Sequence, residues 1–255
     1  MQNTHKWLSR FRLKSNTWVY IPTLETVKEG QLFKKSIEFK WLPPTNYYHL
    51  KSGGHVDAIK YHLNGKFFVH ADVKKFFNSI NRSRITRELK PYFGYEKSRS
   101  IAMESTVSIP LESGQVFALP FGFVQSTIIA SLCLRKSSLG NTIDKLNKTA
   151  GIRVSVYVDD IIVSTQSLEK AEAALSMIQK SAERSGFSLN DEKTQGPSYT
   201  ITAFNIDLQQ NFMRITDWRF IELLSNYKDA SSDKQKRGIW GYVNSVSPAQ
   251  ASMLV

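Results

Sequence analysis

The sequence has few of the features that mark disulfide-bonded or membrane-spanning proteins. One cysteine, Cys133, stands among 255 residues, which excludes an internal disulfide and a cysteine-based zinc cluster. No unbroken apolar run reaches about 18 residues, which argues against a membrane-spanning helix. Residues 1–14 are polar and basic, and no apolar stretch follows them, so they do not read as a secretory signal. We therefore expect a protein of the reducing cytoplasm with no membrane partner.

Acidic residues are also in deficit. There are 22 Asp and Glu against 34 Lys and Arg, a formal net charge of +12. Such an excess suits a polyanionic partner, usually nucleic acid or an anionic membrane surface, although solubility alone is the alternative explanation. Between Lys60 and Arg99 there are ten basic and three acidic residues, so positive charge surrounds Asp72.

The hydrophobic pattern predicts a mixed fold. Residues 67–71 read as a buried strand, and residues 152–164 as two strands joined by an acidic turn. An apolar stripe predicts a helix from residue 168 to Gly186, where glycine suits a left-handed cap. Further helices are expected over residues 79–89, 125–134, 217–227 and 235–246, and a strand pair over 199–208. This order predicts the α+β class, with an antiparallel sheet and helices on one face.

Three carboxylates form the central constellation. Asp72 ends the first buried strand, and Asp159 and Asp160 occupy the tip of the predicted hairpin. Hard divalent cations such as Mg²⁺ prefer oxygen ligands, and two ions roughly 3.5–4 Å apart stabilise an in-line phosphoryl displacement. The backbone carbonyl of Val73 is a further candidate ligand. The alternative is an ordinary β-turn, in which Asp is common.

The residues around these carboxylates resemble those of the reverse transcriptases and, more distantly, of other right-hand nucleic-acid polymerases. Six segments carry the resemblance in order along the chain. They are Ala-Asp-Val-Lys-Lys-Phe-Phe-Asn-Ser-Ile (71–80), Leu-Pro-Phe-Gly-Phe-Val-Gln-Ser (119–126), Tyr-Val-Asp-Asp (157–160), Gly-Phe-Ser-Leu-Asn with Lys-Thr (186–190 and 193–194), Ile-Thr-Ala-Phe-Asn-Ile (201–206) and Gly-Ile-Trp-Gly-Tyr-Val-Asn-Ser-Val (238–246).

The resemblance implies a fingers–palm–thumb architecture, with an antiparallel-sheet palm and a short helical thumb. Residues 1–66 would form the N-terminal part of the fingers, and residues 67–210 the palm with an inserted fingers segment around 81–118. Residues 211–255 would form the thumb.

The resemblance also implies residue roles. The catalytic residues would be Asp72, Asp159, Asp160 and Lys193, with Lys193 beside the departing pyrophosphate. Two Mg²⁺ ions, with Mn²⁺ as an alternative, would be held by Asp72, Val73, Asp159 and Asp160. Nucleotide contacts would come from Val73, Phe77, Phe121, Gln125 and Tyr157. In this set Phe77 would be the steric gate against ribose, and Tyr157 would lie against the primer end.

Basic and histidine residues are further candidates. Arg82, Arg84 and Arg87 would face a nucleic-acid backbone. The fingers should supply a cation to the triphosphate, and Lys34, Lys35, Lys40 and Lys51 are equal candidates. His49 and His55 fit no zinc spacing, and a loop or nucleic-acid contact is the better interpretation.

Departures from the family pattern point to a branch. Phe121 stands where many members have Gln, and Ser126-Thr127 replaces the usual Ser-Pro. This form, together with the His-Leu-Lys-Ser-Gly-Gly-His segment (49–55), resembles the bacterial unknown-group and abortive-infection reverse transcriptases, which are related to retron and group II intron enzymes. Many of these are antiphage defence proteins, so the expected partners are a noncoding RNA, a companion defence protein or a second reverse transcriptase.

The expected activity is addition of deoxynucleotides to a 3′-hydroxyl, giving a DNA product from dNTPs on an RNA template. Template-independent or protein-primed DNA synthesis by the same site is an alternative. A catalytically silent RNA-binding scaffold is another, although the three carboxylates argue against a dead site. An RNA-dependent RNA polymerase is a further alternative, against which Phe77 argues.

Overall fold

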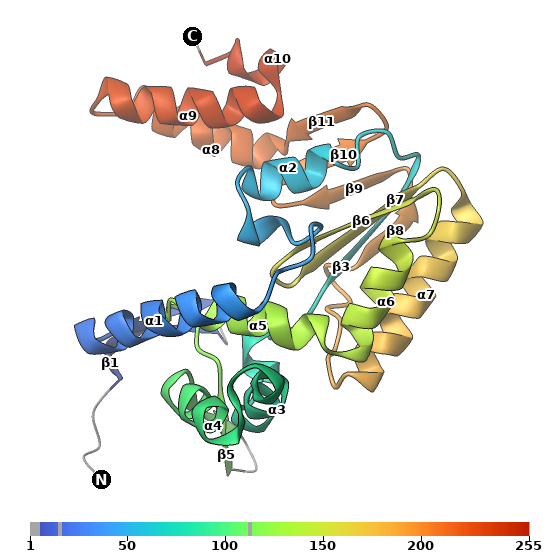
Figure 1. Ribbon diagram of the computed structural model, residues 1–255. Helices are drawn as coiled ribbons and strands as arrows, with labels where there is room; N and C mark the ends of the chain where they lie inside the picture. The colour runs from blue at the N-terminus through green and yellow to red at the C-terminus, as the bar shows by residue number, and fades with distance from the viewer. Residues whose placement is uncertain (1–5, 15–16, 112–113, 255) are drawn as a thin grey trace. The chain divides into compact units, whose positions relative to one another are not determined.

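The computed structural model describes residues 6–14, 17–111 and 114–254. The chain divides into two compact units, each assembled from separate stretches of sequence (Figure 1). One unit, called here the N-terminal unit, comprises Met1–Thr45, Val73–Ile143 and Lys180–Ser188. The other, called the sheet unit, comprises Asn46–Asp72, Asp144–Gln179 and Leu189–Val255. These units cut across the three segments expected from the resemblance, whose functional boundaries stay a prediction.

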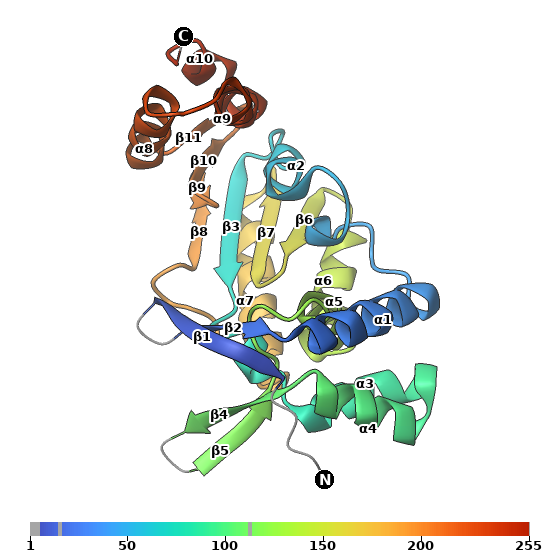
Figure 2. The same ribbon diagram turned by 90° about the vertical axis from the view of Figure 1, so that its left-hand side faces the viewer.

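The sheet unit is built on a four-stranded antiparallel sheet of order β6-β7-β3-β8. Its strands lie side by side in Figure 2. They are β3 (Phe67–Asp72), β6 (Ile152–Tyr157), β7 (Asp160–Thr165) and β8 (Gln195–Ser198). All six residues of β3 are buried, which confirms the prediction of a buried strand. Both predicted strands around the acidic turn are likewise present, because alternating β-branched residues suit a pleated surface.

Helices and a smaller sheet complete this unit. The three-stranded sheet consists of β9 (Thr200–Ala203), β10 (Ile206–Gln209) and β11 (Phe212–Ile215). The helical elements are η1 (Tyr48–Leu50), α2 (Gly54–Lys60), most of α7 (Leu168–Arg184), α8 (Asp217–Lys228), α9 (Asp233–Val246) and α10 (Pro248–Ala251). One apolar core joins β3 and β7 to the small sheet and to α2, α8 and α9 through side chains such as Phe68, Ile162, Ile206 and Val243. Gly186 has a φ of +65°, so the predicted left-handed cap after α7 is confirmed.

The N-terminal unit contains two hairpins and a set of helices. The hairpins are β1 (Trp7–Lys14) with β2 (Thr17–Pro22), and β4 (Val107–Leu111) with β5 (Gly114–Ala118). The helical elements are α1 (Leu24–Lys40), η2 (Phe77–Ser79), α3 (Arg82–Phe93), α4 (Tyr95–Glu104), α5 (Ser126–Arg135) and most of α6 (Ser138–Asn147). Helix α5 is buried along most of its length, as its apolar sequence predicts.

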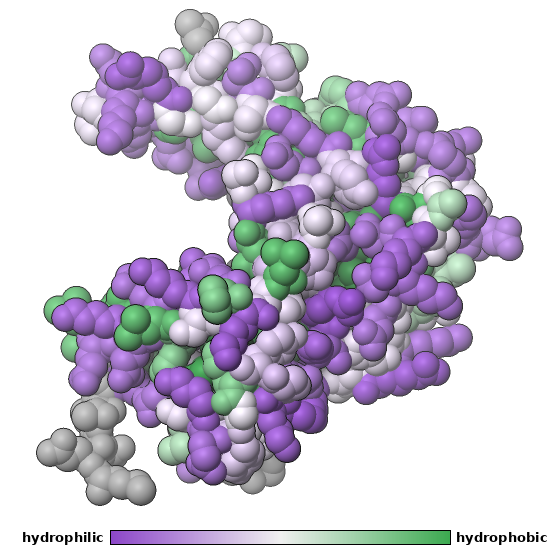
Figure 3. Space-filling view, viewed as in Figure 1, coloured by the Kyte–Doolittle hydropathy of each residue, from purple (hydrophilic) through white to green (hydrophobic). Residues whose placement is uncertain are grey.

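Helix α1 departs from the usual amphipathic pattern. Thr23 caps its N-terminus by accepting a hydrogen bond from the backbone N–H of Thr26. The buried residues of α1 are Thr26, Gly30 and Ile37. By contrast, the large apolar side chains of Leu24, Leu32 and Phe39 are 80%, 63% and 89% exposed. Figure 3 shows hydrophobic side chains over this helix. In the described part of the chain, no helix is both long and apolar enough to cross a membrane.

Candidate active site

The register of the main sheet brings the three predicted carboxylates together within the sheet unit. Asp72, the last residue of β3, is the register partner of Asp160, the first residue of β7. Asp160 is in turn paired with Tyr157 of β6, so Asp159 lies in the turn between β6 and β7. Directly paired residues in an antiparallel sheet have Cβ atoms about 4.5–5.5 Å apart. The strand pairing therefore places two carboxylates side by side with the third at the tip.

These carboxylates repel one another. Burial and the negative charges of Asp160 and Asp72 raise the pKa of Asp159 from 3.8 to about 7. Lys193 Nζ donates a hydrogen bond to Asp72 Oδ2 at 2.7 Å, and the Asp72 side chain is only 4% exposed. Partial burial lowers the pKa of Lys193, but its bond to Asp72 and the charges of the three carboxylates together raise it above its ordinary value. Lys193 is therefore held as a cation beside the carboxylates.

The loop that carries Lys193 is tied to the strand that carries Asp72. The backbone N–H of Asn190 donates to the carbonyl of Asp72 at 2.8 Å, and the N–H of Lys193 donates to the carbonyl of Asn190 at 3.1 Å. This turn returns the lysine toward the end of β3. The predicted role of Lys193 depends on that proximity, which the structure provides.

His70 is a site residue that the sequence pattern did not single out. Its Nε2 lies 2.7 Å from Asp160 Oδ1, and the side chain is 5% exposed. His70 stands two residues before Asp72 and so shares its face of β3, because side chains alternate along a strand. It is the register partner of Ile162, two residues after Asp160 in β7. The two-residue spacing between His70 and Asp72, on a strand that the sequence predicts to be buried, could have identified His70 as a site residue.

The donor set fits a hard divalent cation. Within the described residues, no three His, Cys, Asp or Glu side chains form a ready-made metal cluster, and Asp72 and Asp160 face Lys193 and His70 instead. Carboxylate oxygens are nevertheless the ligands that such ions prefer, and these ions commonly complete their shells with water and substrate phosphates. Burial and the neighbouring carboxylates raise the pKa of Asp159 by disfavouring its charged form, and a bound cation would stabilise that form.

Tyr157 lies in an aromatic cluster next to the carboxylates. Its ring packs edge-on against Phe204 at 5.1 Å between centroids, and it also contacts the rings of His49 and His55. His55 contacts Phe204 and Tyr242 as well. The predicted primer contact of Tyr157 stays a prediction. Both histidines form ring contacts within the sheet unit.

The remaining nucleotide-contact candidates lie in the N-terminal unit. Phe77 is 6% exposed, and its ring meets the ring of Phe121 at 4.6 Å in an edge-on arrangement. The structure thus brings together two residues that are far apart in the sequence and were predicted separately. Phe76 is 2% exposed and packs on Phe187, as expected of a core aromatic. Val73, which follows Asp72 directly, is also buried.

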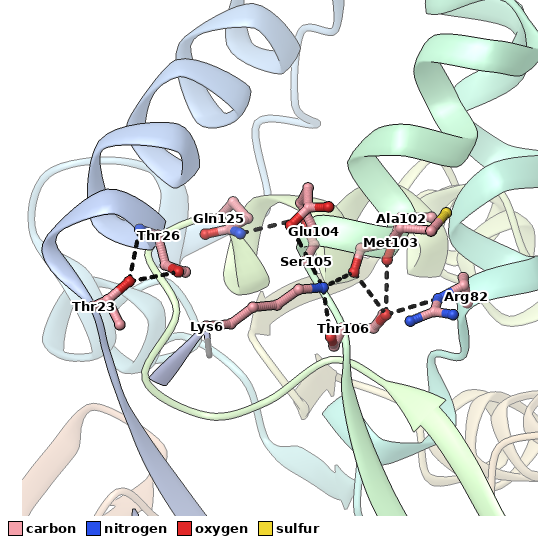
Figure 4. Close-up of polar contacts among 10 residues, drawn as sticks. All are labelled: Lys6, Thr23, Thr26, Arg82, Ala102, Met103, Glu104, Ser105, Thr106 and Gln125. Atoms are coloured by element: carbon pink, nitrogen blue, oxygen red, sulfur yellow. Dashed lines mark hydrogen bonds and ion pairs between the residues drawn. The ribbon is translucent and has the colours of Figure 1, made fainter. Parts of the chain in front are cut away.

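Gln125 is committed to an internal contact. It is 1% exposed, and its amide Nε2 donates to the hydroxyl of Ser105 at 3.3 Å, as Figure 4 shows. Gly30 of α1 leaves room for it, since a Cβ at that glycine would lie 2.2 Å from Gln125 Oε1. A nucleotide contact by Gln125 stays a prediction and would require this side chain to leave its buried position.

Two of the three predicted nucleic-acid-binding arginines also serve internal packing. Arg82 Nε donates to the hydroxyl of Thr106 at 3.1 Å (Figure 4), and its guanidinium covers the ring of Phe117. Arg84 donates to the carbonyl of Ser185. Arg87 is 69% exposed and paired with Glu88, so its charge is the most accessible of the three. Binding of nucleic acid by these arginines stays a prediction.

The candidate triphosphate lysines differ in their surroundings. Lys34 pairs with Glu38 at 3.6 Å, Lys40 donates to the carbonyl of Tyr92 at 2.7 Å, and Lys35 is exposed. Lys51 belongs to the other unit, where its Nζ lies 3.6 Å from the centroid of the Tyr48 ring. These surroundings do not select one lysine, so the assignment stays open.

The chain matches one protein-family model and is similar to several solved structures. A family model described as reverse transcriptase (RNA-dependent DNA polymerase) matches residues 7–206. The chain is similar to a telomerase from Candida albicans solved with a TWJ fragment of telomeric RNA, at 10% identity and a TM-score of 0.56, covering 90% of this chain and 47% of that one. It is also similar to a telomerase from Candida tropicalis solved with such a fragment, at 15% identity and a TM-score of 0.51, covering 81% and 41%. A foamy viral protease-reverse transcriptase in complex with double-stranded DNA matches at 17% identity and a TM-score of 0.48, covering 91% and 34%.

The chain therefore belongs to the reverse transcriptase family. The similarity to the telomerases shows a shared fold, and the predicted α+β right-hand polymerase class is confirmed. Members of this family generally use divalent metal ions. The chain spans between 34% and 47% of the length of these three solved structures.

Proposed function

We propose that this chain is an RNA-directed DNA polymerase that adds deoxynucleotides to a 3′-hydroxyl. The observation that carries the proposal is the pairing of Asp72 with Asp160 in neighbouring strands, with Asp159 at the adjoining turn. The family match supports it, since it includes all three carboxylates. The similar solved structures are complexes with double-stranded DNA or with an RNA fragment. The excess of positive charge in this chain suits such partners.

In the proposed reaction the 3′-hydroxyl oxygen loses its proton to solvent and attacks the α-phosphorus of a dNTP. A new P–O bond forms while the bond from the α-phosphorus to the α–β bridging oxygen breaks, and pyrophosphate leaves. Two Mg²⁺ ions, or Mn²⁺ in their place, would supply charge stabilisation to the attacking and leaving oxygens. Asp72, Asp159 and Asp160 would hold these ions, with the carbonyl of Val73 as a further ligand. The carboxylate neighbours of Lys193 raise its pKa further above neutral pH, so it carries a positive charge that it can place, or a proton that it can donate, at the departing pyrophosphate.

For the biological role we propose antiphage defence in the bacterial cytoplasm, with a noncoding RNA or a companion protein. The support is the resemblance of residues 49–55 and 121–126 to the corresponding segments of defence-associated reverse transcriptases. The single buried cysteine, whose pKa is raised by burial, is consistent with a reducing compartment.

Primer extension tests the proposed activity. The wild-type protein should incorporate labelled dNTP on a primed RNA template in the presence of Mg²⁺, and Asp159→Asn should lose nearly all incorporation while keeping its fold by circular dichroism. Unchanged incorporation by Asp159→Asn would refute the assignment of the site.

Further arms of the same experiment separate the alternatives. Synthesis without a template, or label that stays attached to the protein after denaturation, would support template-independent or protein-primed synthesis. An inactive protein that still binds RNA at moderate salt would support a scaffold. Preference for rNTPs over dNTPs would support an RNA polymerase.

A further inference from the structure

The turn that carries Asp159 contains a residue in a strained conformation. Because Tyr157 pairs with Asp160, β6 and β7 are joined by a loop of two residues, Val158 and Asp159. Val158 has a φ of +60°. In type II′ hairpin turns this first position usually belongs to glycine, and a β-branched residue with positive φ is a genuine outlier. Such a conformation persists only where the surroundings hold it.

His49 provides a direct contact to this strained residue. The backbone N–H of Val158 donates a hydrogen bond to His49 Nδ1 at 2.9 Å. Nδ1 therefore acts as an acceptor, which requires a neutral ring with its proton on Nε2. The carbonyl of Val156 lies further from the same atom, at 3.4 Å, and in this tautomer it receives no proton from Nδ1. Burial lowers the pKa of His49 to about 4, which agrees with a neutral ring.

The segment that carries His49 is itself fixed to the sheet. The carbonyl of Asn46 accepts a hydrogen bond from the N–H of Val156 at 2.9 Å, and Tyr47 forms a parallel bridge to Val156. Strand β6 is one of the two edge strands of the four-stranded sheet, and residues 46–49 run along it toward the turn. The His49 ring also contacts the rings of Tyr47 and Tyr157, each at 5.8 Å between centroids. These contacts leave the imidazole little freedom to move.

We propose that His49 is a positioning residue that holds the Val158–Asp159 turn, and with it the carboxylates of Asp159 and Asp160, in the geometry that binds divalent cations. The inference deepens the proposed function and rests on it. His49 acts through the backbone of the turn, whose Val158 N–H donates to its Nδ1. Outer groups that orient metal-binding side chains typically cost about 10- to 100-fold in metal affinity or activity when they are removed.

Two substitutions separate the hydrogen bond from the bulk of the ring. His49→Asn places its Oδ1 near the position of Nδ1 and so keeps an acceptor for the N–H of Val158. His49→Phe keeps an aromatic ring against Tyr157 but has no acceptor. The matched control is His62→Gln, because His62 is fully buried and its ring nitrogens lie 2.8 Å from the hydroxyls of Ser155 and Ser164, away from the turn.

The measurements are thermal unfolding, Mn²⁺ binding by electron paramagnetic resonance, and steady-state dNTP incorporation. We expect His49→Phe to lower Mn²⁺ affinity and kcat by about 10- to 100-fold, with little change in KM for dNTP. His49→Asn should keep most of the wild-type Mn²⁺ affinity and most of the wild-type kcat. His62→Gln should lower the unfolding temperature and leave Mn²⁺ affinity as in the wild type.

Each outcome decides the inference. Wild-type Mn²⁺ affinity and kcat in His49→Phe, or equal defects in His49→Asn and His49→Phe, would overturn it. If neither variant folds, His49 serves the folding of the sheet, and the positioning role is likewise overturned. If the wild type incorporates no dNTP but Mn²⁺ binding still depends on the acceptor at residue 49, the proposed function fails while the positioning role stands.

Discussion

Removing the positive charge of Lys193 should make the protein depend on divalent cations for its stability. The ammonium lies 2.7 Å from Asp72 Oδ2, and its charge also interacts favourably with Asp159 and Asp160. In Lys193→Gln the buried carboxylate of Asp72 loses this partner while the other two carboxylates stay beside it. The three carboxylates then repel one another more strongly in the native state, where they lie together, than in the unfolded chain, where they lie apart.

The magnitude follows from the burial of the two partners. Breaking a fully buried ion pair costs about 3–5 kcal/mol, whereas an exposed pair is worth about 1 kcal/mol or less. The Asp72 side chain is 4% exposed but that of Lys193 is 50% exposed, so water compensates part of the loss. We expect roughly 1–3 kcal/mol, between these two limits. At about 2–4 °C per kcal/mol for a chain of this size, the unfolding temperature should fall by roughly 2–12 °C.

Differential scanning calorimetry in EDTA and in saturating Mg²⁺ measures the effect. The difference between Lys193→Gln and the wild type should be largest in EDTA and should shrink in Mg²⁺, because the cation supplies the missing positive charge. Lys170→Gln is the matched control, since Lys170 Nζ donates to the carbonyl of Ala150 at 3.0 Å in the same unit. Equal unfolding temperatures for Lys193→Gln and the wild type in EDTA would show that the Lys193–Asp72 pair does not stabilise the fold.

Three further predictions concern pH, backbone and nucleotide choice. Burial lowers the pKa of His62 to about 3, so between pH 6.5 and pH 3 the unfolded chain binds a proton at this residue that the folded chain does not. The free energy of unfolding should therefore fall by roughly 4–5 kcal/mol as the pH is lowered over this range. Urea titrations measure this, and an equal pH dependence in His62→Gln would count against it. Gly122 has a φ of +104°, and a Cβ there would lie 2.1 Å from the carbonyl oxygen of Tyr20. Gly122→Ala should therefore lower the free energy of unfolding by more than about 1 kcal/mol. An unchanged midpoint in urea unfolding would contradict this. If Phe77 is the steric gate, Phe77→Val should raise the ratio of rNTP to dNTP incorporation by about 10-fold or more, and an unchanged ratio would exclude that role.

The sequence predicts the sheet unit well because its signals are local. Alternation and β-branching mark β6 and β7, and an apolar run marks β3. Helix α1 and the hairpin β1–β2 were not predicted. Helix α1 exposes Leu24, Leu32 and Phe39, so no polar face contrasts with an apolar one, and periodicity gives no signal.

In the candidate site, too, local features could be predicted from the sequence, whereas some contacts between distant residues could not. The carboxylates sit at strand ends and in a turn, so their convergence could be expected from short motifs and antiparallel pairing. The hydrogen bonds of His70 and His49 were not predicted, because they join parts of the chain that are distant in sequence. His70 meets Asp160 across 90 residues, and His49 meets Val158 across 109 residues. Burial of Gln125 against α1 is likewise a tertiary effect, since residues 119–126 alone do not show which side chain faces inward.

We propose that Asp72, Asp159 and Asp160 together hold divalent cations for nucleotidyl transfer. Anomalous scattering from crystals grown with Mn²⁺ and a non-hydrolysable dNTP would locate those cations. We expect Mn²⁺ peaks coordinated by carboxylate oxygens of residues 72 and 159 or 160, and their loss in Asp159→Asn. Mn²⁺ bound only elsewhere, or identical peaks in the variant, would contradict it.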